Sequence, residues 1–210
     1  MPNAPSTGAG LSRTTDNSSP RVRFLTGQPA IFLAFFWGLA EGTLFFVVPD
    51  VFLSLVAMLE LRRCWRPVAA ATAGALVAGA LLYGWAARDP QHARNTVARV
   101  PFVTSQMLAK ADESYRARGI GAVFLGPLRG TPYKLYAVAA PAYVGELPFL
   151  AATVPARAER FIVVCLLFGF SARWIRKQWK WSARRLAVGH AFLWILFYAF
   201  YWTWIERNWI

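Results

Sequence analysis

The strongest constraint on this chain is a stretch of sequence that lacks any charged residue. Residues 68–87 carry none, and a helix needs about 20 apolar residues to cross a hydrocarbon core of about 30 Å. Residues 186–205 form a second uncharged stretch, and a third apolar run lies at 158–174. We therefore predict an all-α polytopic membrane protein in which 68–87, 158–174 and 186–205 are spanning helices.

The overall composition agrees with a membrane setting. Apolar residues make up 57% of the chain and charged residues 16%, whereas charged residues are about a quarter of an ordinary soluble domain. Tryptophan, which concentrates at membrane–water interfaces, occurs ten times. The net charge of +13 would suggest nucleic acid in a soluble protein. Here the basic residues stand between apolar segments, which favours anionic headgroups over nucleic acid.

The N-terminal part of the chain differs from the rest. Residues 1–28 are rich in small, polar and turn-forming residues, so we expect a disordered tail. No apolar signal-peptide core is found in the first twenty residues. The remainder, 29–207, is predicted to form one transmembrane domain.

The first apolar region, 29–61, is too long for one span and too short for two. Glu41, Pro49 and Asp50 interrupt it, and ionisable groups are costly in lipid. We predict a re-entrant hairpin of two half-length helices, because irregular backbone at membrane depth needs a cover of protein or cavity water.

The region 119–155 repeats this design. Its break contains Arg129 and Lys134 among the turn-forming residues Gly126, Pro127, Gly130 and Pro132. A second arm is expected over 135–155. Two interrupted segments in corresponding halves of a chain indicate a transport site, so two opposed hairpins would bring Glu41 and Asp50 close to Arg129 and Lys134.

The interval between the hairpins is polar. Over residues 103–118 apolar side chains mark one helical face and charges another, which predicts an amphipathic surface helix. The loop 173–185 carries six basic residues and no acid, so it is predicted to be cytoplasmic. Counting back from it places Arg62–Arg66 and the N-terminus in the cytoplasm as well.

Each candidate charge also has a structural interpretation. Asp50 could cap a helix after Pro49, and Arg129 could extend to the interface. Arg157, Glu159 and Arg160 are interpreted as an interfacial cluster. The spacing of Cys64, Cys165, His92 and His190 predicts neither a disulfide framework nor a metal site. No cofactor is expected, and the absence of common catalytic motifs argues against an enzyme.

Two motifs resemble the DedA/VTT family, also called SNARE-associated Golgi proteins, and its short bacterial YqaA-like branch. They are Phe36-Trp37-Gly38-Leu39-Ala40-Glu41-Gly42-Thr43 with Val48-Pro49-Asp50, and Gly126-Pro127-Leu128-Arg129-Gly130-Thr131-Pro132-Tyr133-Lys134. The resemblance implies two opposed re-entrant hairpins and a bacterial inner-membrane location. It also implies movement of phospholipid or undecaprenyl phosphate between leaflets, in some members with proton coupling. The larger branch has a second arginine where this chain has Leu135, beside Lys134.

These observations lead to one main hypothesis and two rivals. A transporter or scramblase would bind an anionic lipid headgroup through Arg129 and Lys134 and exchange protons through Glu41 and Asp50. The first rival is a structural or interaction protein of the envelope, and the second is a transporter of small solutes or ions. A homo-oligomer is compatible with all three.

Overall fold

The computed structural model describes residues 24–25, 27–43, 45–101, 103–126 and 130–209. The described chain is helical and contains no strand, which confirms the all-α prediction. The elements in chain order are α2 (Gln28–Thr43), α3 (Asp50–Glu60), η1 (Leu61–Arg63), α4 (Trp65–Arg88), α5 (Pro90–Val97), α6 (Ser105–Arg118), η2 (Gly119–Gly121), α7 (Ala122–Leu125), α8 (Tyr133–Ala139), η4 (Ala140–Ala142), α9 (Glu146–Trp179) and α10 (Ala183–Trp209). Most of the predicted tail lies outside the described residues.

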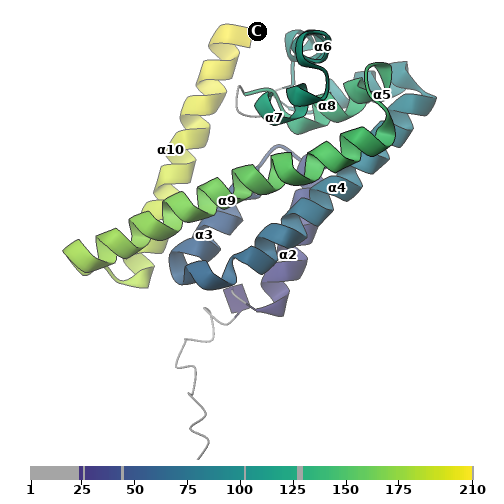
Figure 1. Ribbon diagram of the computed structural model, residues 1–210. Helices are drawn as coiled ribbons and strands as arrows, with labels where there is room; N and C mark the ends of the chain where they lie inside the picture. The colour runs from purple at the N-terminus through teal and green to yellow at the C-terminus, as the bar shows by residue number, and fades with distance from the viewer. Residues whose placement is uncertain (1–23, 26, 44, 102, 127–129, 210) are drawn as a thin grey trace, which may run out of the picture.

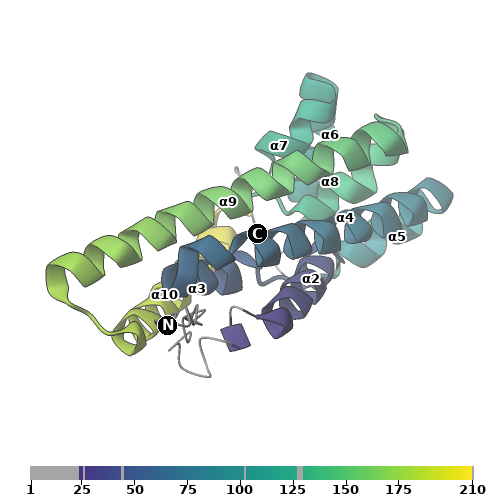
Figure 2. The same ribbon diagram turned by 60° about the horizontal axis from the view of Figure 1, so that its bottom comes forward.

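The long helix α9 organises the molecule. It crosses α3 and α4, while α5 to α8 gather at one end and α10 lies along the other side of α3 (Figures 1 and 2). The segment 61–66 and the α9–α10 turn meet at the opposite end from α5 and α6 (Figure 1). The two basic segments predicted to share one side of a membrane therefore lie at the same end of the molecule.

Helices α2 and α3 flank the break predicted in the first apolar region, and together with their loop they are called the first hairpin. At about 1.5 Å per residue, 16 and 11 residues give helices of about 24 Å and 17 Å, both shorter than a hydrocarbon core. Pro49 stands at the N-cap of α3 with φ −60°, an angle that its ring fixes in advance. The Trp37 indole N–H donates to the Val47 carbonyl at 2.9 Å and ties the loop to α2.

Small residues hold α2 directly against α4. A Cβ atom on Gly74 would lie 2.0 Å from the Phe35 carbonyl oxygen, and one on Gly38 would lie 2.2 Å from that of Ala71. Neither position can accept a side chain unless the backbones separate. The four-residue repeat of Ala and Gly in residues 68–87 permits this close approach, because small side chains let helix backbones come together.

The second hairpin is shorter than the sequence suggested. Helix α7 has four residues and α8 has seven, and the arm expected over 135–155 ends at Ala139. The chain turns through η4, and α9 begins at Glu146 and continues across Pro155 to Trp179. Because Pro141 and Gly145 lie in this turn, they end the arm earlier than Pro155, the boundary that we predicted.

Two helices are long and apolar enough to cross a membrane by length and composition, Trp65–Arg88 and Ala183–Trp204. They contain the predicted spans 68–87 and most of 186–205. The predicted span 158–174 lies within α9, which does not meet the same measure in the described chain. Many large apolar side chains of α9 and α10 are exposed, including Leu167, Phe170, Phe192, Ile195 and Phe200. Such a continuous apolar surface supports membrane association.

The polar interval forms α5 and α6. Met107, Ala111 and Tyr115 are buried on one face of α6 and pack on α8, so the predicted apolar face is present. Across the two helices, both terminal nitrogens of Arg94 donate to the Asp112 carboxylate at 2.8 and 2.7 Å. These hydrogen bonds lower the pKa of Asp112, and partial burial opposes them.

Candidate functional site

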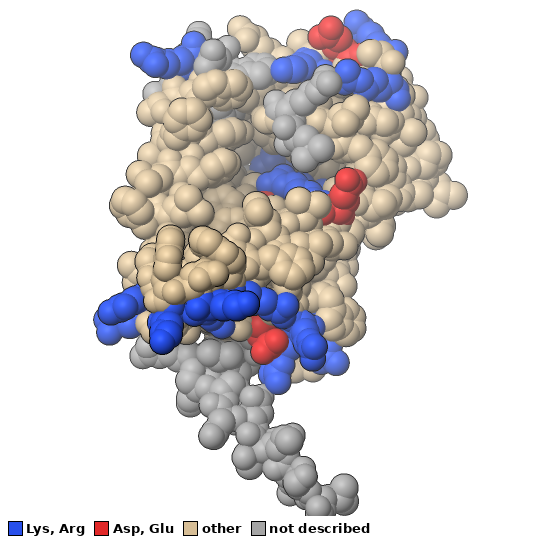
Figure 3. Space-filling view, turned by 60° about the vertical axis from the view of Figure 1, so that its left-hand side comes forward, with Lys and Arg blue, Asp and Glu red and all other residues tan. Residues whose placement is uncertain are grey.

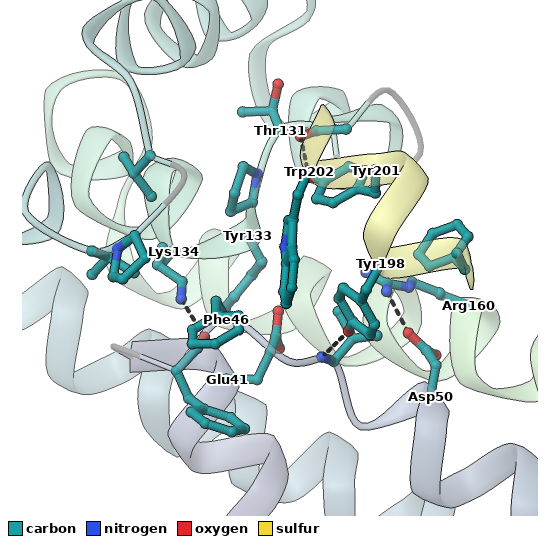
Figure 4. A pocket seen from close by; sticks show the side chains of 18 of the residues that line it. Glu41, Phe46, Asp50, Thr131, Tyr133, Lys134, Arg160, Tyr198, Tyr201 and Trp202 are labelled. Atoms are coloured by element: carbon teal, nitrogen blue, oxygen red, sulfur yellow. Dashed lines mark hydrogen bonds and ion pairs between the residues drawn. The ribbon is translucent and has the colours of Figure 1, made fainter. Parts of the chain in front are cut away.

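A cavity of about 450 Å³ lies between the two hairpin loops, α9 and α10. Its polar lining comes from Glu41, Asp50, Thr131, Lys134 and Arg160. Its aromatic lining is Phe45, Phe46, Tyr133, Trp194, Phe197, Tyr198, Tyr201 and Trp202. In Figure 4 the acids lie toward α2 and α3, and the labelled aromatic residues of α10 lie across the cavity from them. The cavity thus combines a charged side with a largely aromatic wall.

Glu41 forms a buried ion pair with Arg157 of α9. The side chain of Arg157 is 1% exposed and that of Glu41 is 6% exposed. The guanidinium carbon of Arg157 also lies 5.1 Å from the Tyr133 ring centre and 5.0 Å from that of Phe161. Aromatic faces attract a cation, so Arg157 joins the first hairpin, the second hairpin and α9.

Asp50 forms the second ion pair, with Arg160. The Asp50 side chain is 1% exposed and the Arg160 side chain is 23% exposed, so this pair is open on its arginine side. In the described part of the chain, the other carboxylate oxygen, Oδ1, has no hydrogen-bond partner. A buried polar atom normally has one, so Oδ1 can accept a donor that enters the cavity.

Lys134 connects the two hairpins. It lies in the first turn of α8, is 2% exposed, and donates from Nζ to the Phe45 carbonyl of the first hairpin loop at 2.6 Å. This acceptor is a neutral carbonyl, so the positive charge is not neutralised by it. The cavity lining therefore holds two basic groups, Lys134 and Arg160, and two acidic groups, Glu41 and Asp50. Arg157 is buried beside the cavity and pairs with Glu41.

Helix α10 closes the cavity through a few polar contacts. The Tyr198 hydroxyl accepts from the Val48 backbone N–H at 2.9 Å, and the Tyr201 hydroxyl donates to the Gly130 carbonyl at 3.4 Å. Below them, His190 is buried and its Nε2 lies 2.8 Å from Ser54 Oγ and 3.0 Å from Trp194 Nε1. The polar groups of α10 therefore contact both hairpin loops, while other side chains of the helix, such as Phe192, Ile195 and Phe200, are exposed.

The predicted site residues are only partly described. Glu41, Asp50 and Lys134 meet at one cavity, whereas Arg129 and Pro127 lie outside the described residues. Gly126 has the Tyr136 ring 2.0 Å from where a Cβ would lie. Gly130 has φ +84°, a conformation that favours glycine. Pro132 stands at the N-cap of α8, as Pro49 does for α3.

The interpretation of Arg157 and Arg160 as interfacial residues was wrong. Both arginines pair with the predicted acids. They lie within α9, which runs through Pro155, the residue at which we had predicted the second arm to end. A signal was present in the sequence: residues 157 and 160 are three apart, so they share a helix face. Two basic groups one turn apart match the two acids of the first hairpin.

The described residues contain no group of three or more His, Cys, Asp or Glu side chains able to hold a metal ion. No protein-family model, curated protein or solved structure matches the chain.

Proposed function

We propose that this protein moves an anionic lipid, such as a phospholipid or undecaprenyl phosphate, between the leaflets of a bacterial inner membrane. The observation that carries the proposal is a cavity lined by two basic groups, Lys134 and Arg160, by the two acids Glu41 and Asp50, and by many aromatic side chains. Charges inside a membrane domain usually face such a cavity and serve a pathway. The resemblance to the DedA/VTT family supports the same assignment.

In this proposal the two hairpins are re-entrant. Their helices are each too short to cross, and their loops meet beside the cavity. Figure 3 shows Lys or Arg side chains at the bottom of a hollow that lies between the charged ends of the molecule. A hollow at that level would give a headgroup a polar route, while its acyl chains remain in lipid beside α10.

The headgroup phosphate would be held by Lys134 and Arg160, with Arg129 as a further donor. Arginine can bind two phosphate oxygens at once, and lysine acts as a point charge. A phosphate that binds Arg160 competes with Asp50 for the same donor. The released carboxylate would then take up a proton, since an unpaired buried carboxylate disfavours its charged form. Proton uptake and release at Asp50 would couple lipid movement to protons.

The test is leaflet translocation of a labelled anionic phospholipid in liposomes that contain the purified protein. We expect Lys134→Met and Arg160→Gln each to slow translocation about tenfold or more, because a hydrogen bond to a charged group contributes about 1.5–3 kcal/mol. Arg94→Gln is the matched control, since Arg94 also pairs with a carboxylate but lies away from the cavity. Equal rates for wild type and both cavity variants would refute the proposal.

A small-solute transporter is the rival that the cavity size favours, because a volume of about 450 Å³ lies within the range of about 300–1,000 Å³ of small-molecule sites. Free inorganic phosphate or glycerol phosphate, added to the same liposomes, separates the two functions. Uptake of the soluble anion without lipid translocation would establish the rival.

A further inference from the structure

The two cysteines of the chain lie 101 positions apart in sequence and meet in the fold. Cys64 follows η1 at the N-cap of α4, and Cys165 lies on α9. They belong to one buried cluster and are 7% and 2% exposed. Both are free thiols. The sequence predicted no disulfide, because nothing in it placed these segments together.

The pair lines a groove that is separate from the charged cavity. This groove, of about 600 Å³, runs between α4 and α9, and its walls include Val68, Ala69, Ala158 and Ile162. Apart from the thiols and Thr72, its lining is apolar. An apolar molecule dissolved in lipid can enter such a groove and reach the thiols that line it.

From their place in one buried cluster and one groove, we propose that Cys64 and Cys165 form a disulfide on oxidation by a lipid-soluble quinone that reaches them through the α4–α9 groove. The two thiols lose two protons and two electrons and form one S–S bond. The quinone gains both and leaves as the hydroquinone. This proposal is independent of the lipid-transport function.

The disulfide would fix α9 to the η1–α4 junction. Cys165 lies five residues after Arg160 and eight after Arg157, so the tie is about one and two helical turns from the arginines of the ion pairs. Helix α3 is enclosed on this side, because Cys165 also contacts the Leu53 carbonyl with its Sγ atom at 3.7 Å. Oxidation would therefore restrict movement of the first hairpin against α9.

The test uses the full chain in lipid nanodiscs and a fully substituted benzoquinone, which cannot add thiols to its ring. We expect the intact mass to fall by two hydrogens, a cross-linked peptide that contains both cysteines, and reversal by a reductant. Cys64→Ser and Cys165→Ser are the matched controls and should show no loss. Copper–phenanthroline, which oxidises thiols by another route, tests the proximity of the pair separately.

The route is tested by Ala69→Trp, which narrows the groove at an exposed position. Quinone oxidation should slow severalfold, while copper–phenanthroline still cross-links the variant and so shows that its fold is intact. Failure of both oxidants to cross-link the wild type would overturn the thiol pair. Cross-linking by copper–phenanthroline alone, or unchanged quinone oxidation in Ala69→Trp, would overturn the groove as the route.

Discussion

The ion pairs at the cavity and the one between α5 and α6 show how burial changes the role of similar groups. Arg157 and Glu41 are 1% and 6% exposed, whereas Arg94 and Asp112 are 28% and 18% exposed. A solvated pair contributes about 0–1 kcal/mol. In a buried pair, removing one charge destabilises the fold strongly, because the other charge is left without a partner. Replacing both residues by apolar residues of similar size often leaves the stability of the protein unchanged. Stability alone therefore does not explain the charges at the cavity, and the proposed role in binding offers a reason for them.

The largest expected effect is on the buried pair. Arg157→Met leaves Glu41 unpaired, and we expect a loss of about 3–5 kcal/mol in the free energy of unfolding. Equilibrium unfolding in mixed micelles measures it. The double variant Glu41→Gln with Arg157→Met should recover most of the loss, since no buried charge remains. If the single and double variants were equally destabilised, lost packing on Tyr133 and Phe161 would be the dominant contribution.

Arg160→Gln should separate function from stability. Because Arg160 is 23% exposed, water in the cavity can partly solvate the Asp50 carboxylate that the substitution leaves behind. We expect a smaller stability loss, about 1–3 kcal/mol, together with the tenfold slower lipid translocation given above. A variant that lost stability as Arg157→Met does but kept wild-type translocation would reduce this pair to a structural one.

The ion pair between Arg94 and Asp112, which is less buried than the pairs at the cavity, should respond least. Arg94→Gln is expected to cost less than about 1 kcal/mol in the free energy of unfolding and to leave translocation unchanged. The loss should shrink further in high salt, which screens exposed charges. Unfolding in low and high salt measures this, and a salt-independent loss of several kcal/mol would remove the contrast with the cavity.

Acid should abolish the small contribution of the Arg94–Asp112 pair to the free energy of unfolding. Arg94 holds the pKa of Asp112 below its ordinary value of 3.8. The contribution is complete above the unfolded pKa and is lost as the pH falls through the lower folded pKa. The stability difference between wild type and Arg94→Gln should therefore be constant near neutral pH and decrease below about pH 4. A difference that grows on acidification would contradict the assignment.

The parts of the site that could be predicted are those marked by an unusual residue within an apolar run. A proline and two acids are unusual inside an apolar region, so the break between α2 and α3 was predictable. Lys134 was predictable for the same reason. The spaced Gly and Ala residues of α4 are compatible with a close helix contact, but they do not identify α2 as the partner. Arg157 and Arg160 stand in a segment with charges of both signs beside Pro155, a composition equally typical of an interface.

Other parts of the site depend on tertiary packing that no local pattern encodes. Tyr198 and Tyr201 resemble the other aromatic residues of α10, and only the arrangement of the two hairpin loops shows that their hydroxyls have partners there. The meeting of Cys64 and Cys165 is likewise a product of the α9 crossing.

The central claim is that the first hairpin enters and leaves on one side of the membrane, so that its acids lie beside a cavity within the bilayer. Single cysteines at Gln28 and Arg62, the two ends of the hairpin, and at Gln91 of α5, in a Cys64→Ser/Cys165→Ser background, test it with an impermeant maleimide. All three positions are exposed. Our account predicts that Gln28→Cys and Arg62→Cys react from the same side and Gln91→Cys from the other. Reaction of Gln28→Cys and Arg62→Cys from opposite sides would show a hairpin that crosses, and would contradict the account.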